Sequence, residues 1–238
     1  MKAALIIISL ILFPLFVFTQ SKFNFGIKSQ LNYTMYTAHS EQPVDGNLFK
    51  QDYLNAGGAI GLQSSFTKKQ LEFLIGIGFS TNQIGLRADR IVNNDPKNYC
   101  RYSYIVHSKY IDLGLSVPFY ESENFAKYYF NFNYQFLFSS INGMQGSSTM
   151  NGLNGFTYEY LAPEFERFYS QNIGVGLKMK KLVFNSRILE LGMNYNYFLN
   201  RMPKFGMEIT TNSQTKEAFI TPQIQQLSLS MAFWFGKQ

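Results

Sequence analysis

The chain has 238 residues, of which 15% are charged and 17% aromatic, and its formal net charge is +6. A soluble domain has about a quarter charged residues, whereas a helical membrane protein would be far more apolar than this chain, whose mean hydropathy is slightly negative. The mild positive charge comes without a Lys/Arg run or an RNA-binding motif, so nucleic acid is not expected as a partner.

The first predicted element is a targeting segment at the N-terminus. Lys2 is followed by an apolar run over residues 3–18, in the order and of the length typical of a secretory signal peptide. Small residues allow cleavage before Gln20 or before Lys22, which predicts a cleaved signal peptide over residues 1–19 and a mature domain over residues 20–238. The alternative is an uncleaved membrane anchor, for which the run is somewhat short.

The mature chain repeats one pattern, in which large apolar residues occupy every second position. Near the C-terminus, Leu227, Leu229, Met231, Phe233 and Phe235 alternate with residues that are mostly small or polar. This is the period of a strand with two unlike faces. The same alternation predicts eight strands, at residues 23–37, 54–67, 70–86, 103–120, 128–142, 168–180, 183–200 and 223–236.

The predicted connections alternate in length. Those at residues 67–70, 121–127 and 180–183 are short, and they place Lys68-Lys69 and Lys180-Lys181 in turns. Those at residues 38–53, 87–102, 143–167 and 201–222 are long and rich in Asn, Gly, Pro and Ser. Short turns at one end and long loops at the other are typical of up-and-down transmembrane barrels, in which the short turns face the periplasm and the long loops are extracellular.

The second face of the predicted strands decides between lipid and a protein core. A soluble sandwich or a lipocalin-like barrel would carry many Lys and Glu there, but this face carries mainly Gly, Asn, Ser and Gln. Five alternate residues at a tilt of about 40° give about 20 Å of height, close to the apolar band of an outer-membrane barrel. Unpaired edges are forbidden in hydrocarbon, so the sheet must close. The sequence therefore predicts an all-β fold, an eight-stranded antiparallel transmembrane β-barrel in the outer membrane.

Three stretches resemble the PorT-like family of small outer-membrane barrels of Bacteroidetes, which are Gram-negative bacteria. They are KFNFGIKSQLNYT directly after the signal peptide, YIDLGLSVPFY in the fourth predicted strand, and SLSMAFWFG at the C-terminus. The resemblance covers the mature chain and implies a small barrel that the barrel-assembly machinery inserts, without implying an activity. The sequence departs from the family pattern at Ser29-Gln30 and in the Gly-Lys-Gln that follows the last aromatic residue, Phe235.

Charged residues of inward parity form the first candidate site. Lys28 faces Asp112 and Glu190 at similar depths in the predicted barrel, and Glu72 and Lys178 lie nearer the periplasmic end. Buried charges need partners, so these five residues predict a structural ionic cluster and a closed lumen.

Basic residues form the second candidate site, because several fall at or beyond the predicted outer strand ends. They are Arg87, Arg90, Lys97, Arg101, Lys109, Arg201 and Lys204. Such a rim can pair with lipopolysaccharide phosphates, and the alternative is ordinary solvated loop charge. The longest loop, residues 143–167, carries aromatic residues that either bind an unknown protein or ligand or fold over the barrel mouth.

Catalytic residues, cofactors and metals are not expected. His39 falls in the first long loop, and His107 has lipid-facing parity beside Ser108 of opposite parity, so these two neighbours cannot form a dyad. Two histidines without an acidic cluster make a poor metal site, and the single cysteine, Cys100, excludes an intramolecular disulfide. We expect a non-enzymatic envelope scaffold or surface binding module. The alternative is a narrow, porin-like pore or a component of a secretion or uptake assembly, and a lipid-modifying enzyme comes third.

Overall fold

The computed structural model describes residues 22–40, 49–51, 55–68, 70–89, 99–122, 126–149, 157–161, 167–183, 187–210 and 215–235. The predicted signal peptide lies outside these residues. In the part of the chain that is described, no helix is long and apolar enough to cross a membrane.

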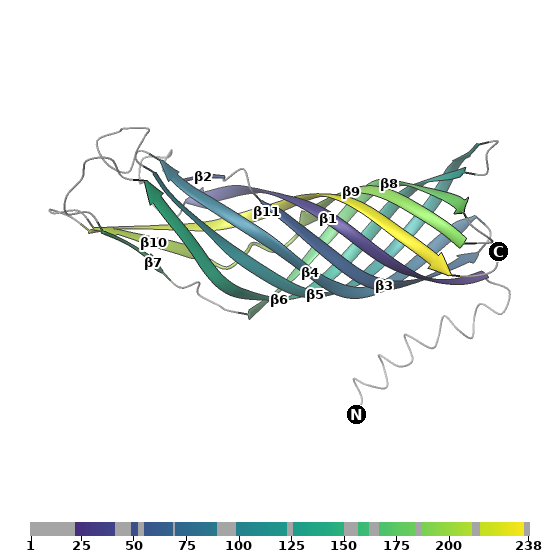
Figure 1. Ribbon diagram of the computed structural model, residues 1–238, viewed down its shortest axis with the longest axis horizontal. Coiled ribbons are helices and arrows are strands. Elements are labelled where there is room, and N and C mark those ends of the chain that lie inside the picture. The colour runs from purple at the N-terminus through teal and green to yellow at the C-terminus, as the bar shows by residue number, and fades with distance from the viewer. Residues whose placement is uncertain are drawn as a thin grey trace, which may run out of the picture.

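Eight strands form the barrel wall. They are β1 (Lys22–Ser40), β3 (Ala56–Lys68), β4 (Leu71–Asp89), β5 (Tyr99–Glu121), β6 (Ala126–Thr149), β8 (Arg167–Val183), β9 (Arg187–Phe198) and β11 (Thr215–Phe235). Each pairs antiparallel with the next wall strand in the chain, and β1 pairs with β11 to close the sheet (Figure 1). Closure gives every wall strand a neighbour on both sides, as the bilayer requires. The predicted eight-stranded antiparallel barrel is therefore confirmed.

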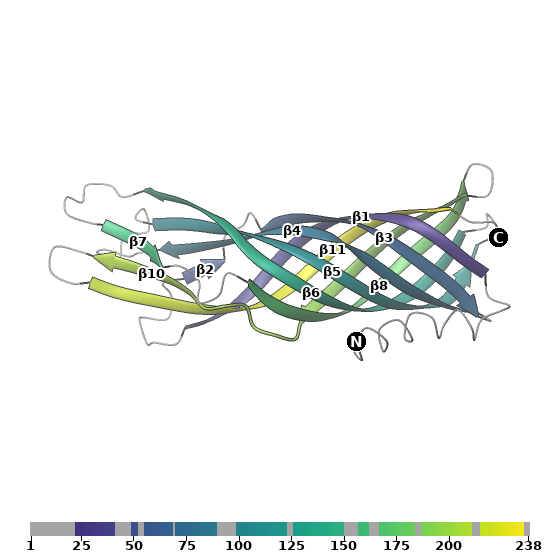
Figure 2. The ribbon, with the colours of Figure 1, turned by 90° about the horizontal axis from the view of Figure 1, so that it is seen from below.

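Three further strands lie at the end of the barrel that carries the long connections. They are β2 (Phe49–Gln51), which pairs with β4, and β7 (Thr157–Leu161) and β10 (Phe205–Thr210), which pair with each other. Figures 1 and 2 show β4, β5, β6 and β11 continuing beyond the barrel at this end, and β10 pairs with the outer part of β11. The prediction of loops over residues 38–53, 87–102, 143–167 and 201–222 is therefore partly wrong, because cross-strand pairing continues through much of these segments.

The turn between β8 and β9 also differs from its predicted position. Lys180 pairs with Glu190 and Val183 pairs with Arg187 in register, so the ladder continues past the predicted strand end. Lys180 and Lys181 lie on β8, and the prediction that they form a turn is wrong. Lys180 thereby keeps the inward parity of Lys178, so its side chain enters the lumen.

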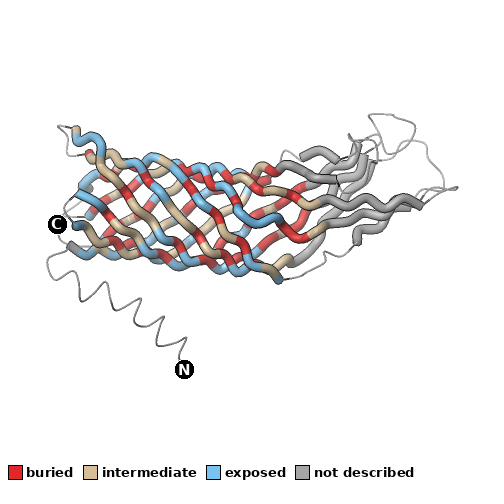
Figure 3. Tube along the Cα trace, turned by 180° about the vertical axis from the view of Figure 1, so that it is seen from behind, coloured by how far each residue is buried: buried red, intermediate tan, exposed pale blue. Residues whose placement is uncertain are grey.

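Exposed and buried residues alternate along the wall strands (Figure 3). On the outer face, large apolar side chains are exposed, with Leu31 at 71% and Phe79 at 62%. On the inner face, polar side chains are buried, with Ser65, Asn172 and Ser228 all at 0%. This distribution is the reverse of that in a soluble barrel, and it requires lipid around the wall.

Aromatic pairs bound the exposed apolar face at both ends. Toward the short turns, the ring centroids of Phe119 and Phe130 are 4.4 Å apart, and toward the long connections those of Phe138 and Tyr169 are 5.5 Å apart. The path along β6 from Phe130 to Phe138 corresponds to about 20 Å of height at a tilt of about 40°. An apolar band of this height between aromatic girdles is the architecture of outer-membrane barrels. The protein is an integral barrel of the outer membrane.

The depth of the band is testable by substitution. Leu113 faces outward near mid-band and is 47% exposed, so L113R should lower the free energy of unfolding in lipid vesicles by about 2–4 kcal/mol. Leu71 faces outward at the short-turn end of β4, where L71R should cost about 1 kcal/mol or less because the charge reaches the interface. Urea unfolding measures both variants. Equal costs would contradict the assigned membrane position.

Candidate functional site

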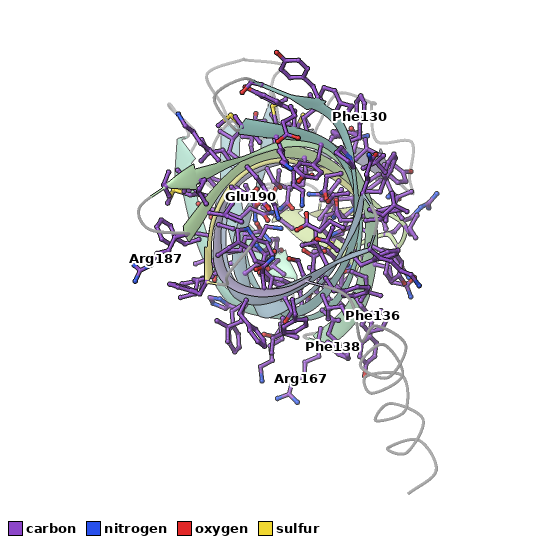
Figure 4. All side chains as sticks on the ribbon, turned by 90° about the vertical axis from the view of Figure 1, so that its right-hand side faces the viewer. Phe130, Phe136, Phe138, Arg167, Arg187 and Glu190 are labelled. Atoms are coloured by element: carbon purple, nitrogen blue, oxygen red, sulfur yellow. The ribbon has the colours of Figure 1, made fainter. Side chains whose placement is uncertain are left out.

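Side chains from all eight wall strands meet in the lumen, which is the candidate functional site. Figure 4 looks along the barrel from the short-turn end, with Glu190 pointing into the ring and Arg167 and Arg187 pointing away from it. From this end outward, the described side chains form an ionic layer, a layer of amides and hydroxyls, and an apolar layer.

Four charged side chains form the lumenal ionic cluster: Glu72 on β4, Lys178 and Lys180 on β8, and Glu190 on β9. Lys178 Nζ lies 2.7 Å from Glu72 Oε2 and 3.4 Å from Glu190 Oε2. Lys180 Nζ contacts Glu72 Oε1 and lies 3.2 Å from Glu190 Oε2. Each lysine therefore bridges both carboxylates, and the four charges cancel. None of the four residues is more than 8% exposed, so the pairing replaces the water that each group has lost.

The cluster connects opposite sides of the barrel. In the closed strand order, β4 and β9 are separated by three strands in either direction, β5, β6 and β8 one way and β11, β1 and β3 the other. Glu72 and Glu190 therefore approach from opposite walls. The two lysines on β8 join them across the lumen.

Aromatic rings flank the cluster. Trp234, which is 1% exposed, donates from Nε1 to Glu190 Oε2 at 3.1 Å. Lys180 Nζ lies 4.3 Å from the centroid of the Trp234 ring and 5.9 Å from that of Tyr129, and such contacts favour a desolvated cation. A Cβ at Gly26 would lie 2.9 Å from the indole, so glycine is needed here to make room for Trp234.

A second ion pair lies deeper in the lumen. Lys28 Nζ on β1 is 3.3 Å from Asp112 Oδ2 on β5. Both residues line a small cavity together with Lys178 and Glu190, so the pair adjoins the lumenal ionic cluster. Because Lys28 and Asp112 also cancel, the whole ionic layer is electrically neutral.

The structure brings the predicted lumenal residues together in two groups instead of one. Lys28 pairs with Asp112, whereas Glu190 pairs with Lys178 and Lys180. Of the two predicted partners of Lys28, Asp112 lies at ion-pair distance, whereas the two lysines of β8 form the ion pairs with Glu190. Lys180 is missing from the predicted cluster because the predicted turn includes it. The parity that it shares with Lys178 is the signal that would have placed it inside.

Amide side chains cross the middle of the lumen. Asn133 Nδ2 on β6 donates to Asn196 Oδ1 on β9 at 3.1 Å. The strand between them carries Gly174, where a Cβ would lie 2.3 Å from Asn133 Oδ1, so this glycine lets the two amides meet. Gln226 Nε2 on β11 donates to Asn82 Oδ1 on β4 at 3.1 Å. These hydrogen bonds join strands that are not neighbours in the wall and so occupy the interior.

The outer part of the lumen is filled by apolar side chains. Ile84 and Tyr104 are each 1% exposed, and the Tyr36 hydroxyl donates to the carbonyl of Gly85 at 2.8 Å. The buried members of this layer are Tyr36, Ile84, Tyr104, Val106, Leu137, Phe198, Met202 and Ile224. The three layers together fill the lumen where side chains are described, apart from small cavities beside Lys28 and beside Ile84.

The predicted basic rim is described only in part. Arg90 and Lys97 lie outside the described residues. Arg87 and Arg101 pair in register across β4 and β5, and their side chains are not described. The prediction that Lys109 lies at a strand end is wrong, because β5 continues outward to Tyr99.

Two further rim residues flank the segment between β9 and β10. Arg201 is exposed after the end of β9, and Lys204 is half-buried just before β10. Arg167, at the outer end of β8, is exposed and was not among the predicted rim residues.

The imidazole of His107 and the hydroxyls of Ser108 and Ser139 lie on opposite sides of the barrel wall. His107 faces outward, with Nδ1 3.0 Å from Thr81 Oγ1, whereas Ser108 faces the lumen, with Oγ 2.7 Å from Ser139 Oγ. The side chain of His39 is not described. Among the described residues, no three His, Cys, Asp or Glu side chains are grouped as a metal site would require.

Comparison with known proteins gives matches at the level of solved structures. No protein-family model matches the sequence, and no curated protein matches it. Neisserial surface protein A is 13% identical with a TM-score of 0.40, covering 89% of this chain and 96% of its own. A major outer membrane protein from Thermus thermophilus (11% identity, TM-score 0.44, 90% and 99% coverage) and OprG from Pseudomonas aeruginosa (7%, 0.43, 91% and 96%) also match. The barrel assignment rests on the closed register and the exposed apolar band.

Lys180 and its neighbour Lys181 offer a matched test of the cluster, because Lys180 is buried in it and Lys181 is exposed. K180M leaves two buried carboxylates with one lysine and should lower the free energy of unfolding by about 3–5 kcal/mol, less if lumen water reaches the site. K181M should change it by about 0.5 kcal/mol or less. Urea unfolding in lipid vesicles measures both, and equal effects would show that Lys180 is not in the cluster.

Proposed function

We propose that the protein is a non-enzymatic outer-membrane barrel that serves as an envelope scaffold or surface binding module and presents its outer strands and loops for binding. The observation that carries this proposal is the packed lumen. An eight-stranded barrel has an interior just wide enough for side chains to fill. Here ion pairs join opposite walls, and amide hydrogen bonds join strands that are not neighbours in the wall, which supports an anchoring role over transport.

The outer strands support binding at the surface. On β6 the strand continues from Phe138, at the outer girdle, to Thr149, and the pairing of β10 with β11 and β7 adds a sheet beyond the band. Sheets of this kind hold the connecting loops away from the lipid headgroups, and loops on a rigid scaffold are common binding elements. The partner we propose is a protein or ligand that meets this extension from outside the cell.

The separation of His107 from Ser108 and Ser139 across the wall supports a non-enzymatic role over a lipid-modifying one. We further propose a relationship to the PorT-like barrels of Bacteroidetes and insertion by the barrel-assembly machinery. The three sequence stretches that resemble this family lie on β1, β5 and β11, and β1 and β11 are the pair that closes the barrel.

Conductance tests the proposal most simply. The mature protein inserted in planar lipid bilayers should show no steady current, because the ionic and amide layers cross the lumen. A sixteen-stranded porin inserted under the same conditions is the positive control. Stable open channels in the wild type would contradict the anchoring role and favour a narrow pore.

Co-isolation of a binding partner tests the surface-binding part of the proposal. Wild-type protein isolated from envelopes in mild detergent should retain a partner that is lost when residues 150–166, which include β7, are replaced by a short Gly/Ser linker. A heat-dependent gel shift should show that this variant still folds. A partner retained equally by both proteins would place binding away from the outer extension.

A further inference from the structure

The outer boundary of the apolar band can be followed across four neighbouring strands. On β4, β5, β6 and β8, one row of outward residues in register consists of Phe79, Lys109, Phe138 and Tyr169. The next row outward consists of Thr81, His107, Ser140 and Arg167. On β4, β6 and β8 the outward residues thus change from aromatic to polar between these two rows, which marks the outer end of the apolar band.

Three rings form an aromatic patch just below this boundary. The centroids of Phe136 and Phe138 are 5.0 Å apart, those of Phe138 and Tyr169 5.5 Å, and those of Phe136 and Tyr169 6.4 Å. Tyr169 is 67% exposed. In Figure 4, Phe136, Phe138 and Arg167 project from the same side of the barrel. The patch therefore meets lipid in the outer half of the bilayer.

Two cations border this patch. Lys109 is next to Phe138 in register on β5, and Arg167 lies two residues from Tyr169 on the same face of β8. Both are exposed, and within the described residues neither is joined by an ion pair to an acidic side chain. Their Cα atoms are separated by about 12 Å, given the spacing of two strands and two residues. Both long side chains can therefore reach one headgroup.

We propose that Lys109 and Arg167 bind the phosphate groups of an outer-leaflet glycolipid, a phosphorylated and acylated saccharide of the lipid A class, whose acyl chains lie against Phe136, Phe138 and Tyr169. The proposal rests on the position of the barrel in the outer membrane and does not depend on the proposed function. It narrows the predicted rim to a defined site and adds Arg167 to it.

The chemistry of the two sides matches. The guanidinium of Arg167 can donate two parallel hydrogen bonds to a phosphate, and the ammonium of Lys109 adds a point charge. Lys109 lies beside Phe138 in register, so its stem can follow apolar surface while its ammonium reaches toward the interface. A water-soluble phosphate would gain nothing from the aromatic patch. A phosphorylated lipid gains binding energy from both the two cations and the aromatic patch, which is why we assign a lipid as the occupant.

The test measures binding of diphosphoryl lipid A to the full mature protein in a neutral detergent, for the wild type and for K109Q/R167Q. Loss of charge-assisted hydrogen bonds to phosphate should raise the Kd of the double variant by about tenfold or more. Phosphate-free lipid A should bind the wild type as weakly as diphosphoryl lipid A binds the double variant. A heat-dependent gel shift verifies that both proteins are folded.

Arg187 supplies the matched control, because it is an exposed arginine at the opposite girdle, with its guanidinium carbon 5.9 Å from the centroid of Phe235. R187Q should bind diphosphoryl lipid A with the wild-type Kd. Equal Kd values for the wild type and K109Q/R167Q would overturn the proposal, and so would an equal loss in R187Q. Competition by phosphatidylglycerol as strong as that by lipid A would overturn the assignment to a glycolipid.

Discussion

A carboxylate or an ammonium group that leaves water needs a partner of opposite charge, and this lumen holds four such groups in mutual contact. Glu72 and Glu190 approach from opposite walls, and Lys178 and Lys180 bridge them. Removing any one of the four leaves a buried net charge. The lumenal ionic cluster thus ties the two sides of the barrel together at the end where the strands are joined by short turns.

This internal closure is what allows the outer face to be mainly apolar. In lipid, the backbone is satisfied by closure of the ladder between β1 and β11. Most polar side chains of the band are turned inward, and the outward Ser29 donates its hydroxyl to the carbonyl of Met231. Many of those inward polar groups pair with one another, in the neutral ionic layer and in amide hydrogen bonds such as that from Asn133 to Asn196. Chemistry directed at other molecules is thereby left to the girdles and to the strands beyond them.

The sequence predicts the part of the fold that lies in the bilayer, because lipid and lumen make opposite demands on successive residues. The alternation that runs through Leu227, Leu229 and Met231 carries that information directly. Beyond the outer girdle neither face meets lipid, so the alternation fades. A register shift between Tyr104 and Ile105, opposite Asn142 and Met144, then changes the pairing on β5 and β6. Strands in this region are held by cross-strand pairing, which no short stretch of sequence reveals.

The alternation of inward and outward residues also predicts which charged residues enter the lumen, but it does not predict which of them pair. Parity places Lys28, Asp112 and Glu190 inside, but which charges meet depends on the stagger between distant strands, which only closure determines. Lys180 is missed because it falls where β8 continues through a predicted turn.

The central claim is that opposite walls are coupled through the lumenal ionic cluster, and a double-mutant cycle between Glu72 and Lys178 measures this most directly. Their charged atoms are 2.7 Å apart and come from β4 and β8. Urea unfolding of the wild type, E72Q, K178M and the double variant in lipid vesicles should give a coupling energy above about 1 kcal/mol, within the range for contacting residues. Additivity of the two single changes to within about 0.5 kcal/mol would contradict the account.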